Sequence, residues 1–308
     1  MYIALLGSEN EPQIIHLMQA LQAQGQQTVV VNTQHFGERW QLSYDPDFND
    51  GILHFGPASA ILAVPTVERL AMSQISAVYW HQYLPPTCKG EDDAHTQWLT
   101  QEITSTLLCW FNFSETRWVN SIAAIRAHQC KPTQMRAAAK IGANIPYTFV
   151  GNCEQVAYQF CCNMREVIYK PVKGGKTTQF LQKHRHLRRH LSQFLATQPV
   201  TFQAYIEGTN IRSYVLGNEV ISIQIDSDSV DFRDDESAQP CLTLLPKNMQ
   251  DLALAICREL GMYWCAIDWR KTAKGKYYFL EANPCPFFLH VENVTGVDIT
   301  GRLIKLLT

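Results

Sequence analysis

The chain has 308 residues, 46% of them hydrophobic and 18% charged, and its formal net charge at pH 7 is −2. This length allows a large buried core shared by two or three lobes, and the near-neutral charge argues against a nucleic-acid partner and against an acidic disordered tail. No apolar run approaches the roughly 20 residues that cross a bilayer, and MYIALLGSENEP predicts a first strand rather than a signal peptide, so we expect no membrane partner.

Residues 1–119 predict an N-terminal parallel α/β lobe, because strand, helix and strand follow one another at the spacing of a parallel sheet. Ile14, Met18 and Leu21 lie on one side of the first expected helix, and Gly25 stops it. The expected elements are strands at 1–7, 28–32 and 75–82, and helices at 10–24 and 98–111.

A second unit begins near Asn120 with two short helical patterns before Gly142. Gly217-Asn218 predicts a two-residue hairpin turn between two strands, and the polar, acidic stretch 226–240 predicts a loop. The remaining expected elements are strands at 147–150, 166–172, 200–206, 212–217 and 218–225, a helix at 248–261, a hairpin at 266–283 and a closing segment at 296–307.

Ten cysteines are scattered along the chain, and no two of them form a C-x-x-C pair. This pattern predicts reduced, mostly buried thiols in a cytoplasmic protein and argues against zinc. The adjacent Cys161 and Cys162 are expected to point to different sides of their element.

The stretch AIDWRKTAKGKYYFLEANP places an acid in each arm of a hairpin. A two-residue turn at 274–275 would put Asp268 directly opposite Glu281, with Arg270 and Asn283 on the same face. Two carboxylates with Cβ atoms ~5 Å apart repel each other, so something must offset the repulsion. Two explanations stay open: Mg²⁺ bound by Asp268, Glu281 and Asn283, whose side chains offer oxygen donors, or a solvated sheet face with Arg270 as the counter-ion.

Lys170 lies inside the apolar strand VIYKPV, where a charge is costly unless an anion meets it. Gly174 and Gly175 follow, and glycines allow backbone N–H groups to approach an anion closely. The spacing is not that of a Walker loop. The alternative is a lysine that extends from the strand end to solvent.

The segment FQAYIEGTNIR at 202–212 breaks at Gly208, where it would present backbone groups to a flat base. Glu207 or Asn210 would meet sugar hydroxyls, and Arg212 a phosphate. The alternative is an ordinary edge strand and turn.

Taken in order, an early lysine, a second lysine with a Gly-rich loop, a Q-x-Y-I-x-G-x-x-x-R segment and D…E-x-N resemble the ATP-grasp superfamily over about residues 120–290. The resemblance implies an α/β and α+β architecture: an N-terminal parallel α/β lobe (1–119), a central ATP-grasp lobe (120–201) and a C-terminal ATP-grasp lobe with a metal site (202–308). The two α+β lobes would clasp ATP, and Mg²⁺ would bridge its phosphates.

The resemblance also implies roles for single residues. Lys131 and Lys170 would contact phosphates or the adenine, and Glu207 or Asn210 the ribose. The base would lie against the hinge formed by Gln203, Ala204, Tyr205 and Ile206. Gly174 and Gly175 would cover the phosphates. Mg²⁺ would be held by Asp268, Glu281 and Asn283.

Further stretches resemble the ribosomal-protein glutamate ligases and the graspetide ring-forming ligases, which modify peptides. They are AVYW at 77–80, RWVN at 117–120, DFR at 231–233 and IDWR at 267–270, although His81-Gln82 stand where the ring-forming enzymes tend to have arginine.

The function implied is an ATP-dependent ligase that joins a carboxylate to an amine or hydroxyl through an acyl phosphate. Arg212 is the candidate to stabilise the acyl phosphate, because its planar fork suits that group, and Arg233 and Arg270 are candidates for the carboxylate substrate. A peptide, an amino acid or a small carboxylate or amine would be the substrate, and a homodimer is compatible with the family. An ATP sensor without ligase activity and a kinase on the same fold are the alternatives.

Overall fold

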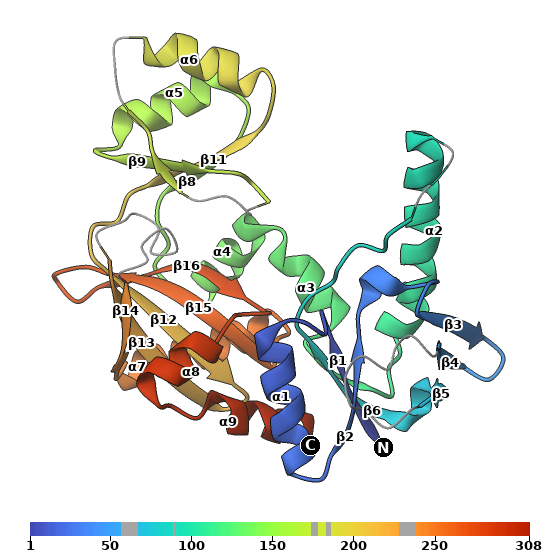
Figure 1. Cartoon of the computed structure of the whole chain (residues 1–308). Coiled ribbons are helices and arrows are strands. Elements are labelled where there is room, and N and C mark those ends of the chain that lie inside the picture. Colours follow the sequence, from blue (N-terminus) through green and yellow to red (C-terminus); the bar gives the residue numbers. More distant parts are fainter. Residues whose placement is uncertain (57–66, 89, 91, 174–177, 183–185, 228–237) are drawn as a thin grey trace. The chain divides into compact units, whose positions relative to one another are not determined.

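The computed structural model describes residues 1–56, 67–88, 90, 92–173, 178–182, 186–227 and 238–308 (Figure 1). The chain divides into two compact units. The first joins Met1–Ala123 to Cys285–Thr308, and the second is Ala124–Pro284. The finer division into three lobes at 120 and 202 stays a prediction.

The first unit contains the predicted parallel sheet, in the strand order β2-β1-β6-β7. The hydrophobic strands have buried interiors, and Pro12 in the first turn of α1 is compatible with a helix start because its missing N–H is not needed there. The sheet comprises β1 (Tyr2–Leu6), β2 (Gln27–Val31), β6 (Ile75–Trp80) and β7 (Arg117–Val119). Its helices are α1 (Pro12–Ala23), α2 (Asp93–Phe111), α8 (Leu289–Thr295) and α9 (Ile299–Leu307), with short 3₁₀ turns η1 (Thr33–His35) and η3 (Met72–Gln74).

Two features of this unit were not predicted. A small antiparallel sheet consists of β3 (Trp40–Asp45), β4 (Asp50–Phe55) and β5 (Arg69–Ala71). Helix α2 begins at Asp93, five residues before the predicted start, because the Asp92 side chain accepts a hydrogen bond from the His95 N–H and caps it.

The second unit contains two antiparallel sheets, each packed against helices. The four-stranded sheet has the order β10-β9-β11-β8 and buries its apolar side chains against α5 and α6. Its elements are β8 (Thr148–Gly151), α5 (Glu154–Asn163), β9 (Val167–Lys170), β10 (Gln179–Phe180), α6 (Leu187–Leu195) and β11 (Val200–Ala204).

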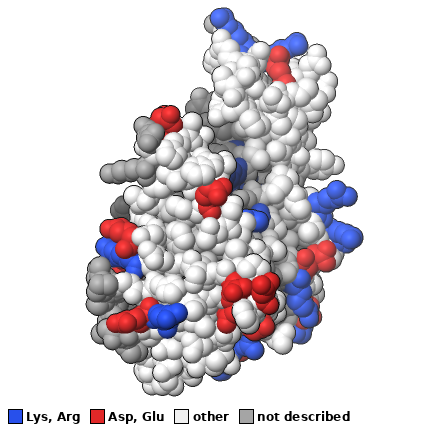
Figure 2. Space-filling view, turned by 90° about the vertical axis from the view of Figure 1, so that its right-hand side faces the viewer, with Lys and Arg blue, Asp and Glu red and all other residues white. Residues whose placement is uncertain are grey.

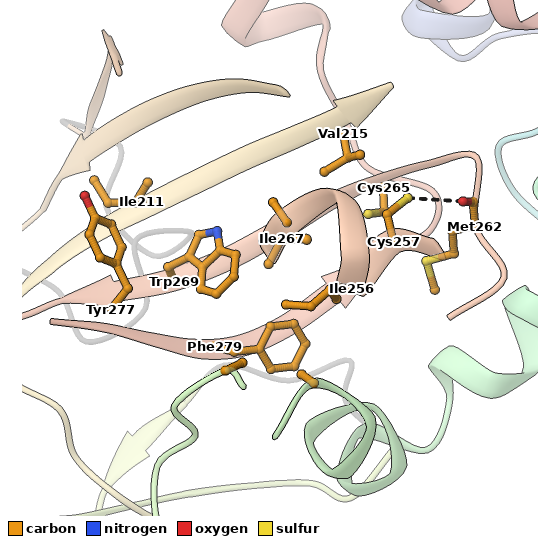
Figure 3. Close-up of a cluster of buried hydrophobic side chains, with 14 of the residues drawn as sticks. Ile211, Val215, Ile256, Cys257, Met262, Cys265, Ile267, Trp269, Tyr277 and Phe279 are labelled. Atoms are coloured by element: carbon orange, nitrogen blue, oxygen red, sulfur yellow. Dashed lines mark hydrogen bonds between the residues drawn. The ribbon is translucent and has the colours of Figure 1, made fainter. Parts of the chain in front are cut away.

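The five-stranded sheet has the order β14-β13-β12-β15-β16, and its core includes Ile211, Ile256, Ile267, Trp269 and Phe279 (Figure 3). The predicted turn at Gly217-Asn218 is confirmed, since Leu216 pairs with Glu219. The elements are β12 (Thr209–Leu216), β13 (Glu219–Asp226), β14 (Gln239–Thr243), α7 (Lys247–Glu259), β15 (Trp264–Lys271) and β16 (Tyr277–Asn283). Helices α3 (Ile122–His128) and α4 (Lys131–Lys140) come earlier in the chain, before β8.

The β15–β16 hairpin confirms that Asp268 pairs with Glu281, but it reaches that register by a different route. The prediction of a two-residue turn was wrong. The Thr272 N–H donates to the Lys276 carbonyl, which leaves a loop of three residues that ends at Gly275. A β-bulge at Leu280 then shifts the register back by one residue. The two deviations cancel at the acid pair.

None of the ten cysteines forms a disulfide, but the prediction of mostly buried thiols was wrong. The fully buried ones are Cys161, Cys257 and Cys265, whereas Cys162 is exposed, as expected for the neighbour of a buried residue. No helix among the described residues has the length and apolar character needed to cross a membrane. On the face shown in Figure 2, acidic and basic side chains of described residues are interspersed rather than gathered into one basic area.

Gly208, between β11 and β12, has φ +154°, and a Cβ there would overlap the carbonyl oxygen of Lys271. We expect Gly208→Ala to lower the free energy of unfolding by roughly 3 kcal/mol, because backbone strain and steric overlap combine. Gly275→Ala is the matched control: its φ is also positive, at +75°, but nothing lies within 4 Å of the added Cβ. It should cost only about 1 kcal/mol. Urea unfolding of both variants measures the difference, and equal losses would contradict the steric argument.

Candidate functional site

Three neighbouring strands of the five-stranded sheet place charged side chains in a row. Arg212 on β12 is the direct cross-strand partner of Asp268 on β15, and Asp268 is the partner of Glu281 on β16. Arg212 donates to both carboxylate oxygens of Asp268, from Nε at 2.7 Å and from Nη2 at 2.8 Å. The Lys131 ammonium, at the first residue of α4, forms an ion pair with Glu281. Each acid of the predicted pair therefore has its own cation.

This arrangement argues against one of the two explanations of the acid pair, the solvated sheet face with Arg270 as the counter-ion. Asp268 is 8% exposed, so it does not lie on a solvated face, and its counter-ion is Arg212 rather than Arg270. Arg270 instead donates to Asn210 Oδ1 at 2.7 Å and to the Gly208 carbonyl at 3.2 Å. The prediction that Arg270 is the counter-ion of Asp268 was therefore wrong.

Burial and ion pairing act on Glu281 in opposite directions. Burial raises the pKa of its carboxyl group, but Lys131, Lys170 and His128 together outweigh burial and lower the pKa overall. Near pH 7 Glu281 is thus held as a carboxylate by the two lysines, Lys131 first and Lys170 second. Burial also lowers the pKa of His128, so its ring is neutral near pH 7.

Arg212 is held as a cation. Burial opposes its charge, but the attraction and the two hydrogen bonds of Asp268 raise the pKa of the guanidinium above its ordinary value. A buried ion pair with two parallel hydrogen bonds fixes the position of both partners.

Sequence reasoning missed Gln134, which aligns the strand carrying Glu281 and Asn283. The Gln134 side chain accepts from the Ala282 N–H at 3.1 Å and donates to the Ala282 carbonyl at 2.8 Å, so one amide pairs with both backbone groups of that residue. His128 Nδ1 lies 2.9 Å from the same carbonyl. The available signal was helical spacing: Gln134 follows Lys131 by three residues and so lies on its face of α4.

Lys170 is positioned at the end of β9 by Gln203 on β11. Lys170 Nζ donates to Gln203 Oε1 at 3.3 Å, and the Gln203 amide nitrogen donates to Thr148 Oγ1 at 3.0 Å. Gln203 is 1% exposed. Both predicted lysines, Lys131 and Lys170, therefore stabilise the negative charge of Glu281. The Gln203 side chain holds Lys170 in place.

The segment after Gln203 presents fewer bare backbone groups than expected. The N–H of Ala204 donates to the Tyr147 carbonyl, and that of Tyr205 to the Glu166 carbonyl. Ile206 is partly buried.

The two candidates for the ribose differ in their surroundings. Glu207 is exposed, whereas Asn210 is 7% exposed and accepts a hydrogen bond from Arg270. The ring of Tyr205 lies 5.5 Å from the Arg270 guanidinium, which ties Arg270 to this segment.

The predicted metal ligand Asn283 lies at the end of β16, two residues after Glu281, where it pairs with Ala266. Among the described residues, no group of three or more His, Cys, Asp or Glu side chains could hold a metal, so the predicted set depends on the Asn283 amide. Gly174, Gly175 and Arg233 lie outside the described residues.

Comparison with known proteins gives the family and the fold. The RimK-like ATP-grasp domain matches residues 130–307. A ribosomal protein bS6–L-glutamate ligase of Salmonella paratyphi B is 32% identical over 113 residues, which cover 34% of this chain and 37% of that protein. The alignment thus spans little more than a third of the curated relative.

Two solved structures resemble nearly the whole chain. The ATP-grasp ligase PsnB, complexed with a minimal precursor, has a TM-score of 0.81 at 24% identity and covers 99% of this chain and 97% of its own. The macrocyclase MdnC of Microcystis aeruginosa MRC, bound with the precursor peptide MdnA, has a TM-score of 0.85 at 21% identity and covers 100% and 99%. At these identities the likeness establishes the fold, which confirms the predicted ATP-grasp architecture. Because the family match covers more than half of its residues, the chain belongs to the RimK-like ATP-grasp family.

Proposed function

We propose that the chain is an ATP-dependent ligase that joins a carboxylate to an amine or a hydroxyl, with a peptide or an amino acid as substrate. The observation that carries the proposal is the cluster of Lys131, Lys170 and Arg212 around Asp268 and Glu281, within an ATP-grasp fold. The named relative is a glutamate ligase, and structures of PsnB contain precursor peptide, Mg and ADP.

The donor set fits Mg²⁺. Asp268, Glu281 and Asn283 lie on adjacent strands and offer carboxylate and amide oxygens, the ligands that this hard cation prefers. When bound, Mg²⁺ would neutralise charge on the β- and γ-phosphates. The E-x-N strand would keep its alignment through Gln134, whose amide grips the residue between the two ligands.

The charges of the cluster suit a polyphosphate. The cluster has one formal positive charge, because it contains three cations (Lys131, Lys170 and Arg212) and two carboxylates (Asp268 and Glu281). The His128 ring adds no charge while it is neutral. We propose that Lys131 exchanges its carboxylate partner for a phosphate oxygen when ATP and Mg²⁺ arrive. Such an exchange conserves the number of ion pairs, so the cluster stays neutralised with and without nucleotide.

The remaining roles follow from placement. Arg212 is pre-aligned by its bidentate pair with Asp268 and would stabilise charge on the acyl phosphate. Glu207 is the better candidate for the ribose, because Asn210 is already bonded to Arg270. Gln203, Ala204, Tyr205 and Ile206 would border the base, and the loop at Gly174 and Gly175 would cover the phosphates.

In the proposed reaction a carboxylate oxygen of the substrate bonds to the γ-phosphorus of ATP, and ADP leaves with the bridging oxygen. The amine nitrogen or hydroxyl oxygen of the second substrate then bonds to the acyl carbon, and inorganic phosphate leaves. No side-chain nucleophile takes part, so the protein contributes alignment and charge stabilisation.

Phosphate release in the presence of ATP and Mg²⁺ tests the proposal, with single amino acids and short acidic peptides added as substrates. A ligase releases phosphate only when both carboxylate and acceptor are present, and it leaves a joined product that mass spectrometry detects. Binding of ATP without release under any condition would indicate a sensor, and a stable phosphorylated product would indicate a kinase.

We expect Glu281→Gln to abolish ATP turnover, because the variant loses a metal ligand and leaves Lys131 without its carboxylate. Phosphate release measures turnover, and far-UV circular dichroism should show an unchanged fold. Tyr278→Phe, on the same strand, is the control and should keep turnover. Wild-type turnover in Glu281→Gln would rule out the metal assignment.

We expect Gln134→Leu to raise the Mg²⁺ concentration needed for half-maximal turnover and to lower the free energy of unfolding by about 2 kcal/mol, because the Ala282 backbone groups lose their amide partner. Gln134→Glu still accepts from the Ala282 N–H but cannot donate while ionised, so it should fall between Gln134→Leu and the wild type. A loss of stability without any change in the Mg²⁺ requirement would show that Gln134 does not act on the metal site.

A further inference from the structure

His81 is a buried imidazole at the carboxyl end of β6, in the first unit. Its N–H and that of Gln82 both donate to the Leu6 carbonyl, at 3.0 Å each, so the ring lies where β1 and β6 end side by side. The chain runs from β1 through α1 to β2 on one side, and β6 adjoins β1 on the other. In open parallel sheets, ligands bind at such a switch point, outside the carboxyl ends of the strands.

The protonation of His81 follows from Gln13, in the first turn of α1. The Gln13 side-chain oxygen accepts from the backbone N–H groups of Phe288, at 2.7 Å, and Leu289, at 3.4 Å. Its NH₂ group therefore faces the other way, toward Tyr79 Oη at 3.1 Å and His81 Nδ1 at 3.2 Å. The Pro286 carbonyl oxygen also lies 3.3 Å from this nitrogen, so three acceptors share the two N–H protons. Because an NH₂ group only donates, an N–H on Nδ1 would face another donor at 3.2 Å, and the geometry therefore favours an unprotonated, accepting Nδ1.

A neutral imidazole carries one proton, and Nδ1 has none, so the proton is on Nε2. Burial lowers the pKa of His81 to about 4, which keeps the ring neutral at pH 7. The ring is 4% exposed, and within the described structure Nε2 has no hydrogen-bond partner. An unsatisfied buried N–H is costly, so this one calls for an acceptor, which a bound ligand or a water molecule would supply.

Gly7 and Phe287 adjoin the His81 ring. A Cβ on Gly7 would lie 3.2 Å from Cδ1 and Cγ1 of Ile14 and 3.5 Å from Cδ2 of His81, the ring atom bonded to Nε2, so a side chain at this position would crowd that edge of the ring. Phe287 lies edge-on to the ring, with centroids 5.1 Å apart, and is itself 60% exposed.

We propose that the Nε2–H of His81 binds a carboxylate or peptide carbonyl oxygen of the substrate, making the switch point of the first unit a substrate-binding site. The site requires an oxygen acceptor because the group that it presents is a single neutral donor. Gln13 is the positioning residue, since it fixes the tautomer. The inference rests on the proposed function for the identity of the substrate, but not for the existence of the donor.

The tautomer is tested on the ¹⁵N-labelled full chain by NMR at pH 7, with the His81 signals assigned from their loss in a variant. We expect a protonated Nε2 and an unprotonated Nδ1. A protonated Nδ1 would overturn the inference, whatever the enzyme's activity.

Binding is tested with two amide variants. In glutamine the amide nitrogen is three bonds from Cβ, as Nε2 is in histidine, whereas in asparagine it is two bonds away, as Nδ1 is. With the substrate that stimulates phosphate release, His81→Asn should raise the KM for that substrate about tenfold and leave the KM for ATP unchanged. His81→Gln should stay near the wild type.

Equal effects of the two variants on KM, or effects confined to the melting temperature, would identify His81 as a core histidine and overturn the inference. If no substrate stimulates phosphate release, the proposed function fails but the site is still testable without ATP. L-Glutamate and a short glutamate peptide are then titrated into the labelled protein. A shift of the His81 Nε2–H signal supports the site, and no shift with either probe overturns it.

Discussion

The juxtaposition of Asp268 and Glu281 across two neighbouring strands is the constraint on which the candidate site depends. Two carboxylates directly opposite each other on neighbouring strands destabilise a sheet unless positive charge lies between or beside them. The protein supplies it from three elements: Arg212 from the next strand, Lys131 from the start of α4, and Lys170 from the end of β9. The two acids are therefore surrounded by cationic side chains. A cluster that contains both carboxylates and cations suits the binding of a metal ion and a polyphosphate.

The supporting residues explain how this charged cluster keeps its geometry. Gln134 pairs with the backbone between Glu281 and Asn283, and Gln203 holds Lys170 while itself anchored on Thr148. Both are uncharged amides, buried to 1% exposure, and each bridges two elements far apart in the sequence. A buried amide can hold charged neighbours without adding charge, which leaves the electrostatic balance to the acids and the cations.

The same device occurs in the first unit, where Gln13 fixes the orientation of His81. There the amide is itself oriented by two backbone N–H groups, so the direction of its hydrogen bonds, and not just their presence, is determined. The two units thus differ in chemistry. One unit gathers charged side chains around two carboxylates, and the other holds a neutral imidazole in a buried position.

The sequence by itself determined the parallel sheet of the first unit, the hairpin at Gly217, the pairing of Asp268 with Glu281 and the ATP-grasp family. These follow from local signals: hydrophobic period, turn glycines and the order of spaced motifs. It did not determine which cation meets which acid. The sequence suggested Arg270 as the counter-ion of Asp268, but the strand order β12-β15-β16 puts Arg212 beside Asp268, and Arg270 donates to Asn210 instead. The roles of Gln134, Gln203 and Gln13 were likewise decided by the tertiary structure, because an amide carries no sequence signature of its partner and acquires one only when distant backbone groups are brought within hydrogen-bonding distance.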